Sequence, residues 1–103
     1  MDPVFACDMT AMTGVQRARH HELAKRLRPA VVATEELVDG YALRFEMAPE
    51  LLMALAEFVT FERLCCPWLT LAVEAERSGG ALRLRMTAGA EAKPSIRAEF
   101  GIP

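Results

Sequence analysis

The 103-residue chain lacks an apolar run long enough to span a bilayer. Its longest nearly apolar stretch covers residues 51–61 and contains Glu57, whereas a membrane helix needs about 20 residues. Low-complexity tracts are also absent, which argues against disorder. Near the start stands the acidic Asp2, and no apolar segment of a secretory signal follows it. We therefore expect a cytoplasmic protein with no membrane contact.

A strong excess of one charge is lacking too, since the formal net charge is −2. Basic residues gather only within residues 17–28, an asymmetry that can indicate an anionic partner. That segment has no interleaved aromatic residue for base stacking and no recognisable DNA-binding signature. Nucleic acid is therefore not expected as a partner, and a solvated helix face paired with acidic neighbours is the favoured interpretation.

Cysteine and histidine are scarce: the chain has three cysteines and two histidines, namely Cys7, Cys65, Cys66, His20 and His21. In the cytoplasm thiols are kept reduced. The three cysteines are therefore expected to be buried hydrophobes, metal ligands or redox groups rather than a structural disulfide. Residues 1–103 are predicted to form a single domain, because a chain of this length can bury roughly 60 to 68% of its unfolded surface.

A segment of the chain recurs. Residues 40–47 (GYALRFEM) and residues 79–86 (GGALRLRM) match at a displacement of 39. Each copy follows a helix-like stretch, a proline and a strand-like stretch, so the pattern predicts an αββ unit used twice. The expected fold is α+β, with a four-stranded antiparallel sheet, helices on one face and a short C-terminal helix. Chance similarity between two hairpins is the alternative interpretation.

Helix boundaries follow from capping and proline signals. The first helix should begin near Thr13, which forms a capping box with Gln16, and end before residue 29. The second opens at residue 49, is apolar almost all round, and should end within about two residues of Pro67, with a strand beginning near residue 68 or 69. The last should run roughly from residue 91 to 100 and stop at Gly101.

The strands show a period of two. Apolar residues alternate with polar ones in three segments, which predicts a sheet with one apolar and one charged face: Leu43, Phe45 and Met47; Leu69, Leu71 and Val73; Leu82, Leu84 and Met86. Asp39-Gly40 predicts a type I′ hairpin turn, and residues 78–80 a looser one. On the charged face, Glu74 and Glu76 are expected to meet Arg83 or Arg85.

The second helix ends in Glu62-Arg63-Leu64-Cys65-Cys66-Pro67, where two of the three cysteines are adjacent. Side chains of neighbouring helical residues diverge by about 100°, but Pro67 disfavours helical dihedrals at Cys66. The second sulfur can therefore turn toward its neighbour or toward Cys7, while a disulfide between the two adjacent cysteines is not expected. A helix C-terminus raises a thiol pKa, so catalysis by a free thiolate is poorly supported.

Two further residues are candidates for this site. The helical spacing of His20 with Leu23, Ala24 and Leu27 places this histidine toward the core, as a packed side chain or a ligand, and leaves His21 solvated. Glu62 shares the helix with the cysteines. We expect it to form a salt bridge to a surface base such as Arg63 or Arg26; the alternative is a hard ligand or proton acceptor beside the thiols.

The Glu62–Trp68 segment, ERLCCPW, together with residues 5–9 and 17–20, resembles small uncharacterised bacterial proteins that carry an E-R-x-C-C-P-aromatic signature followed by a hairpin with Gly-Gly. The resemblance spans most of the chain. It implies an association with heavy-metal response, and it brings no established activity with it.

Three functions remain open. The leading hypothesis is a non-catalytic soft-metal-binding protein in which Cu(I), Zn(II), Hg(II) or As(III) is held by Cys65, Cys66 and Cys7, with His20 as a further ligand. The second is a thiol redox sensor in which Cys7 pairs with Cys65 or Cys66. The third is an interaction module, for example a homodimer, whose cysteines only pack; burial under the Trp68 ring is the structural role expected of them in that case.

Overall fold

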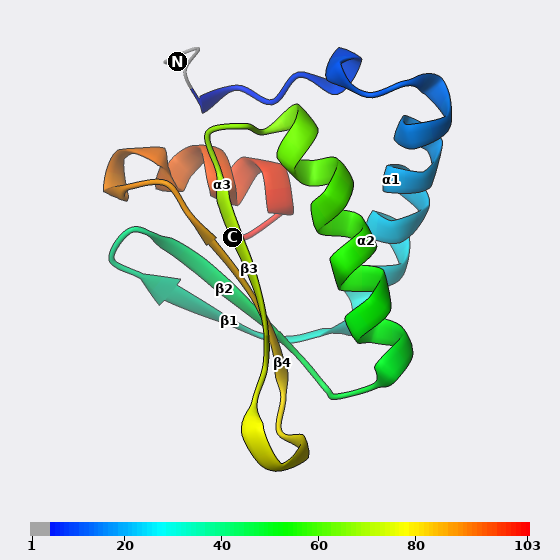
Figure 1. Ribbon diagram of the computed structural model, residues 1–103. Coiled ribbons are helices and arrows are strands. Elements are labelled where there is room, and N and C mark those ends of the chain that lie inside the picture. The colour runs from blue at the N-terminus through cyan, green and yellow to red at the C-terminus, as the bar shows by residue number, and fades with distance from the viewer. Residues whose placement is uncertain (1–4) are drawn as a thin grey trace.

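The computed structural model describes residues 5–103, so the start of the chain, on which the expectation of no secretory signal rests, lies outside the described residues. The fold is α+β, as predicted. Two helices, α2 and α3, pack on a four-stranded antiparallel sheet of order β1-β2-β4-β3, and α1 packs against α2 (Figure 1). The elements are α1 (Gly14–Leu27), β1 (Val31–Leu37), β2 (Gly40–Phe45), α2 (Pro49–Cys65), β3 (Thr70–Ala75), β4 (Leu82–Thr87) and α3 (Lys93–Phe100).

The helix ends lie where the sequence signals put them. The side-chain oxygen of Thr13 accepts from the Gln16 backbone amide at 3.1 Å, and the Gln16 side chain accepts from the Thr13 amide at 2.9 Å, which completes the capping box. α2 ends at Cys65 and β3 begins at residue 70, so both boundary predictions around Pro67 are confirmed within about a residue. α3 ends at Gly101, whose φ of 65° suits glycine.

The two hairpin turns differ from the prediction in where the backbone has positive φ values. Gly40 already belongs to β2 and pairs with Leu37, and it has no positive φ, so Asp39-Gly40 does not form the central pair of a type I′ turn. Glycine is needed at position 40 because a Cβ there would collide with the Met86 carbonyl oxygen of β4. Positive φ occurs instead at Ser78 (61°) and Gly79 (69°), in the turn that was expected to be looser.

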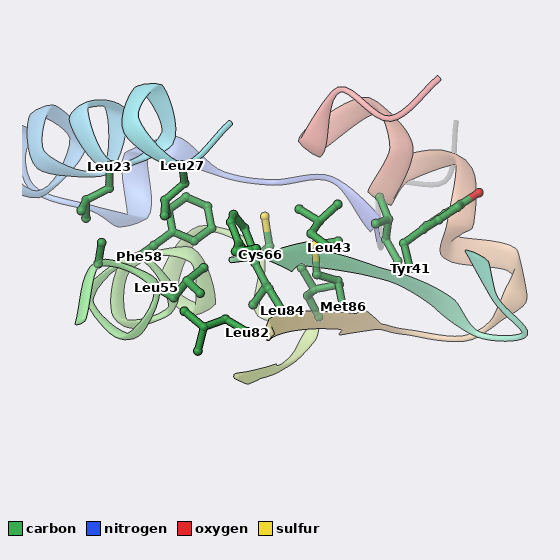
Figure 2. Close-up of a cluster of buried hydrophobic side chains, with 14 of the residues drawn as sticks. Leu23, Leu27, Tyr41, Leu43, Leu55, Phe58, Cys66, Leu82, Leu84 and Met86 are labelled. Carbon is green, nitrogen blue, oxygen red and sulfur yellow. The ribbon is translucent and has the colours of Figure 1, made fainter. Parts of the chain in front are cut away.

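The apolar sheet face lies against the helices and forms the core (Figure 2). Leu43 pairs with Leu84 across β2 and β4, and Phe45 pairs with Leu82; all four are buried. Met47 was expected to continue this face. It lies beyond the end of β2 and is 37% exposed, because the chain has already left the sheet to enter α2.

Replacing Leu84 with alanine should lower the free energy of unfolding by about 2 to 5 kcal/mol, as for other fully buried leucines. Leu84 is 2% exposed and contacts the core from the centre of the sheet. Denaturant titration measures the loss. Val38→Ala is the control, because Val38 is 86% exposed and its truncation should change stability by less than about 0.5 kcal/mol. A loss below about 1 kcal/mol at Leu84 would contradict the assignment of this face to the core.

The proposed duplication stays a prediction, although the sheet is compatible with it. β2 and β4, the second strands of the two αββ units, lie together at the centre of the sheet and run antiparallel. Arg44 and Arg83 occupy equivalent positions in the repeated segments and are cross-strand partners. A two-fold axis relating the units would pass through this pair.

The opposite sheet face carries the expected charges. Glu74 lies 3.5 Å from Arg83 and 3.8 Å from Arg85, as predicted. Glu76 instead binds Arg44, at 3.1 Å, which lies on β2, one strand farther across the sheet than the β4 arginines predicted for it. Among residues 5–103 no helix combines the length and apolarity that crossing a membrane requires.

Candidate functional site: a sulfur and carboxylate cluster

The amino-terminal segment reaches the carboxyl end of α2 through two hydrogen bonds. The backbone amide of Asp8 donates to the Cys65 carbonyl at 2.8 Å, and the Trp68 indole nitrogen donates to the Ala6 carbonyl at 3.1 Å. Figure 1 shows this segment running across the end of α2. Residues 9–11 make one turn of 3-10 helix, and residues 6–8 have no regular structure. The two bonds hold Cys7 against the end of the helix.

Cys7 and Cys66 form a disulfide with a Cα–Cα distance of 4.7 Å. The prediction that Cys7 lies close to the adjacent cysteines is therefore confirmed. The leading expectation of metal-binding thiols does not describe these two cysteines, which form one of the pairs that the redox alternative allowed, because docking of the amino-terminal segment brings residues 59 positions apart within bonding geometry. Sequence reasoning left the partner of Cys7 open between positions 65 and 66; the structure selects Cys66.

Cys65 is a free, fully buried thiol. Its sulfur lies 3.7 Å from the Cys66 sulfur, although adjacent helical side chains should diverge. The backbone explains the approach: Cys66 has φ −124° and ψ 69°, outside the helical region, as predicted from Pro67. Three sulfur atoms thus gather at one helix end. Trp68 is only partly buried, and its indole nitrogen donates to the Ala6 carbonyl. Cys65 and Cys66 are themselves members of the buried core, so they do not depend on the Trp68 ring alone for their burial.

Glu62 occupies the centre of the cluster and is completely buried. One of its carboxylate oxygens lies 2.7 Å from His20 Nε2, and the other lies 3.3 Å from the Cys66 sulfur. The Cys65 sulfur is 3.7 Å from the first oxygen. The expected salt bridge to a surface base is therefore wrong. Glu62 is one helical turn before Cys65 and Cys66, on the face that α2 buries, so it meets their sulfurs and a buried histidine instead.

His20 faces the core, as its helical spacing predicted, and is 6% exposed. Its ring stacks on Phe58 of α2 with centroids 5.1 Å apart. The stacking and the Glu62 contact together fix the imidazole orientation. His21 is exposed, again as expected.

Glu99 belongs to the cluster and was missed by sequence reasoning. It lies on α3, half-buried, and one of its oxygens is within 4.8 Å of ligand atoms on Cys7, Glu62 and Cys66. The one sequence feature that could have indicated it is helical spacing: Glu99 follows the buried Ile96 by three positions, so the two residues share a face of α3. Nothing in the sequence says that this face of α3 meets the end of α2.

Two overlapping groups of side chains have the spacing of a metal site. The first consists of Cys7, Glu62, Cys66 and Glu99, and the second of His20, Glu62 and Cys65. All four residues predicted as metal ligands thus lie around Glu62, which belongs to both groups. The oxidised Cys7–Cys66 pair provides no thiolate, so the sulfur ligands of the first group require reduction of the disulfide.

Burial raises the pKa of the Cys65 thiol to about 12, and the carboxylates of Glu62 and Glu99 add to this effect. The direction agrees with the sequence prediction, but the main cause is loss of solvent rather than the helix dipole. Burial also raises the pKa of Glu99, and the charge of Glu62 is the second cause of this rise. At neutral pH the cluster therefore holds Cys65 as a protonated thiol.

Cys65 should resist alkylation in the native protein, because it is buried and protonated near neutral pH. Iodoacetamide at pH 8 should label it at least about a hundredfold more slowly than in urea, as measured by mass spectrometry of proteolytic fragments. Cys7→Ser/Cys66→Ser, in which position 65 is the only cysteine, prevents exchange among sulfurs and serves as the second measurement. Native labelling at the rate of the unfolded chain would contradict the burial of this thiol.

An apolar cavity of about 450 Å³ adjoins the cluster between the helices and the sheet. The polar residues of its wall are His20, Arg28, Thr34, Glu62 and Glu99. The rest of the wall is mainly apolar: Ala24, Leu27, Val31, Leu43, Phe45, Leu55, Phe58, Leu84 and Phe100. A second hollow of about 270 Å³ is lined by Cys7 and again by Glu99. The cluster therefore lies between two cavities.

Comparison with protein-family models, with curated proteins and with solved structures finds no match for this chain.

Proposed function

We propose that the reduced protein binds a soft metal ion through Cys7 and Cys66, with Cys65 as the third sulfur. One observation carries the proposal: the structure bonds the first two sulfurs to each other and brings the third within 3.7 Å of Cys66. Three convergent thiols favour Cu(I), Hg(II) or As(III), and with nitrogen or oxygen ligands also Zn(II). The proposal includes kinship with the bacterial group associated with heavy-metal response, which the Glu62–Trp68 signature resembles.

The surrounding side chains support cation binding. Glu62 and Glu99 supply carboxylate oxygens next to the sulfurs, and His20 supplies an imidazole nitrogen within 4.8 Å of the Cys65 sulfur. A metal ion displaces the protons of coordinating thiols and so overcomes the raised pKa of Cys65. The buried carboxylate of Glu62 is placed to accept such a proton.

The disulfide is the metal-free, oxidised form in this proposal. Forming it transfers two electrons and two protons from the thiols of Cys7 and Cys66 to a disulfide oxidant, which is reduced to two thiols, and the bonded sulfurs are then lost as thiolate ligands. Oxidation would therefore release the metal, whereas reduction by a cellular dithiol would restore the site.

Native mass spectrometry tests the proposal. Protein reduced with a phosphine should retain one Cu(I) or Hg(II) per chain in the presence of excess glutathione, and the oxidised protein, two hydrogens lighter, should retain at least tenfold less. Cys7→Ser should weaken retention and expose Cys66 to alkylation. Equal retention by the reduced and oxidised forms, or none by either, would contradict the proposal.

The disulfide itself favours a second candidate, a thiol redox sensor without a metal. Oxidation would fasten the amino-terminal segment to the end of α2, and reduction would leave it held by the Asp8 and Trp68 hydrogen bonds. Hydrogen exchange of residues 5–12 measured in both redox states, with metals chelated, distinguishes this candidate. A sensor requires faster exchange on reduction; a metal site does not.

A further inference from the structure

The cavity beside the cluster is large enough for an organic group. Its volume of about 450 Å³ lies within the range of small-molecule sites, about 300 to 1,000 Å³, and such sites combine an apolar wall with a few polar groups. Here the polar residues of the wall are His20, Arg28, Thr34, Glu62 and Glu99. Leu27, Leu43 and Leu84 line the cavity, and Figure 2 shows them in the same buried cluster as Cys66.

Glu62 joins the cavity to the sulfur atoms. Its carboxylate lines the cavity and also lies 3.3 Å from the Cys66 sulfur and 3.7 Å from the Cys65 sulfur. Glu99 lines both this cavity and the hollow beside Cys7. A ligand whose metal lies at the sulfurs can therefore direct an attached group into the apolar space.

The charged side chains of the site limit the class of ligand that it can bind. Two carboxylates, on Glu62 and Glu99, face the cluster, and His20 is the neighbouring base inside it. A neutral hydrocarbon would form no bond to the sulfurs, and a bare metal ion would leave the apolar cavity empty. A soft metal cation that carries one apolar organic substituent matches the sulfurs, the carboxylates and the cavity together.

We propose that the site of the reduced protein takes organometal cations of the type R–M⁺, with the metal on a cysteine sulfur and the apolar R group in the cavity. The inference rests on the proposed soft-metal function and names its substrate class. For phenylmercuric acetate, the Cys66 thiol gives up its proton to acetate, its sulfur forms the Hg–S bond, and the Hg–O bond breaks. The Hg–C bond stays intact, and no electron is transferred.

The test uses the full chain reduced with a phosphine. Phenylmercuric acetate, methylmercuric acetate and Hg(II) are each titrated in competition with glutathione, and bound species are weighed by native mass spectrometry. Relative to glutathione, phenylmercury should bind at least tenfold more tightly than methylmercury. Equal preference for the two organic groups would overturn the inference, since it would show that the cavity contributes nothing.

A cavity-filling variant provides the second measurement. Ala24→Phe places a ring in the cavity wall and should weaken phenylmercury binding at least tenfold while Hg(II) binding is unchanged. Ala18→Phe is the matched control, because this alanine lies on the same helix and is exposed. Undiminished phenylmercury binding by folded Ala24→Phe would overturn the inference. If the variant does not fold, the phenyl to methyl preference of the wild type decides.

The two proposals fail differently. Retention of Hg(II) without any preference for phenylmercury overturns only the organometal inference. Retention of neither compound by the reduced protein overturns the soft-metal function as well.

Discussion

Replacing Cys7 with serine should lower the free energy of unfolding of the oxidised protein by about 4 kcal/mol. The chain-entropy model gives this value for a crosslink between residues 59 apart, because the disulfide restricts the unfolded chain. The amino-terminal segment would then be held mainly by the Asp8 amide and the Trp68 indole. Urea titration under oxidising conditions measures the loss.

Two controls separate the disulfide from other effects of this substitution. In a phosphine, the wild type and Cys7→Ser should unfold within about 1 kcal/mol of each other, since neither then contains the crosslink. Cys66→Ala should reproduce the oxidised loss, because Cys66 is the partner sulfur. An oxidised Cys7→Ser protein as stable as the wild type would show that the crosslink does not stabilise the fold.

Replacing Glu62 with alanine should lower the free energy of unfolding by about 3 to 5 kcal/mol. The change removes the carboxylate 2.7 Å from His20 Nε2, leaves a buried imidazole without this partner, and opens space next to the sulfurs. Glu62→Gln is the matched control. It keeps the volume and an acceptor oxygen for His20, and should cost at least about 2 kcal/mol less than alanine.

A double-mutant cycle isolates the pair itself. His20→Phe keeps a ring that can stack on Phe58, and in its background Glu62→Ala should be less damaging by about 1 to 3 kcal/mol. Additive losses would mean that Glu62 stabilises the protein through the sulfurs or through packing alone. Chemical denaturation of the four proteins in a phosphine gives the coupling energy without a contribution from the disulfide.

Local signals account for most of the secondary structure. The capping box at Thr13, the proline at position 67 and Gly101 each act within a few residues of the helix end that they determine. The alternating strands likewise indicate their buried face by themselves. The failures occur where a distant backbone intervenes: Gly40 is needed because β4 passes close to it, which no local turn rule contains.

The candidate site was predictable only in part. The adjacent cysteines and Pro67 indicated convergent sulfurs, and the face of His20 followed from the spacing of leucines around it. Glu62 was a candidate from its place on the same helix, yet its partner was predicted wrongly, because the favoured interpretation considered bases on the protein surface. His20 is 42 positions away and becomes a neighbour only when α1 and α2 pack together.

By itself the sequence determined the α+β class, the helix ends and the non-helical backbone at Cys66 that lets its sulfur turn toward the other cysteines. These features depend on residues within one or two helical turns of one another. The tertiary structure alone decided that Cys7 bonds to Cys66, that Glu62 is buried in contact with His20 and the sulfurs, and that Glu99 joins them beside an apolar cavity. Those contacts link elements far apart in the chain. Their geometry is fixed by how helices pack on the sheet, and side-chain periodicity indicates which face is buried without indicating what that face will meet.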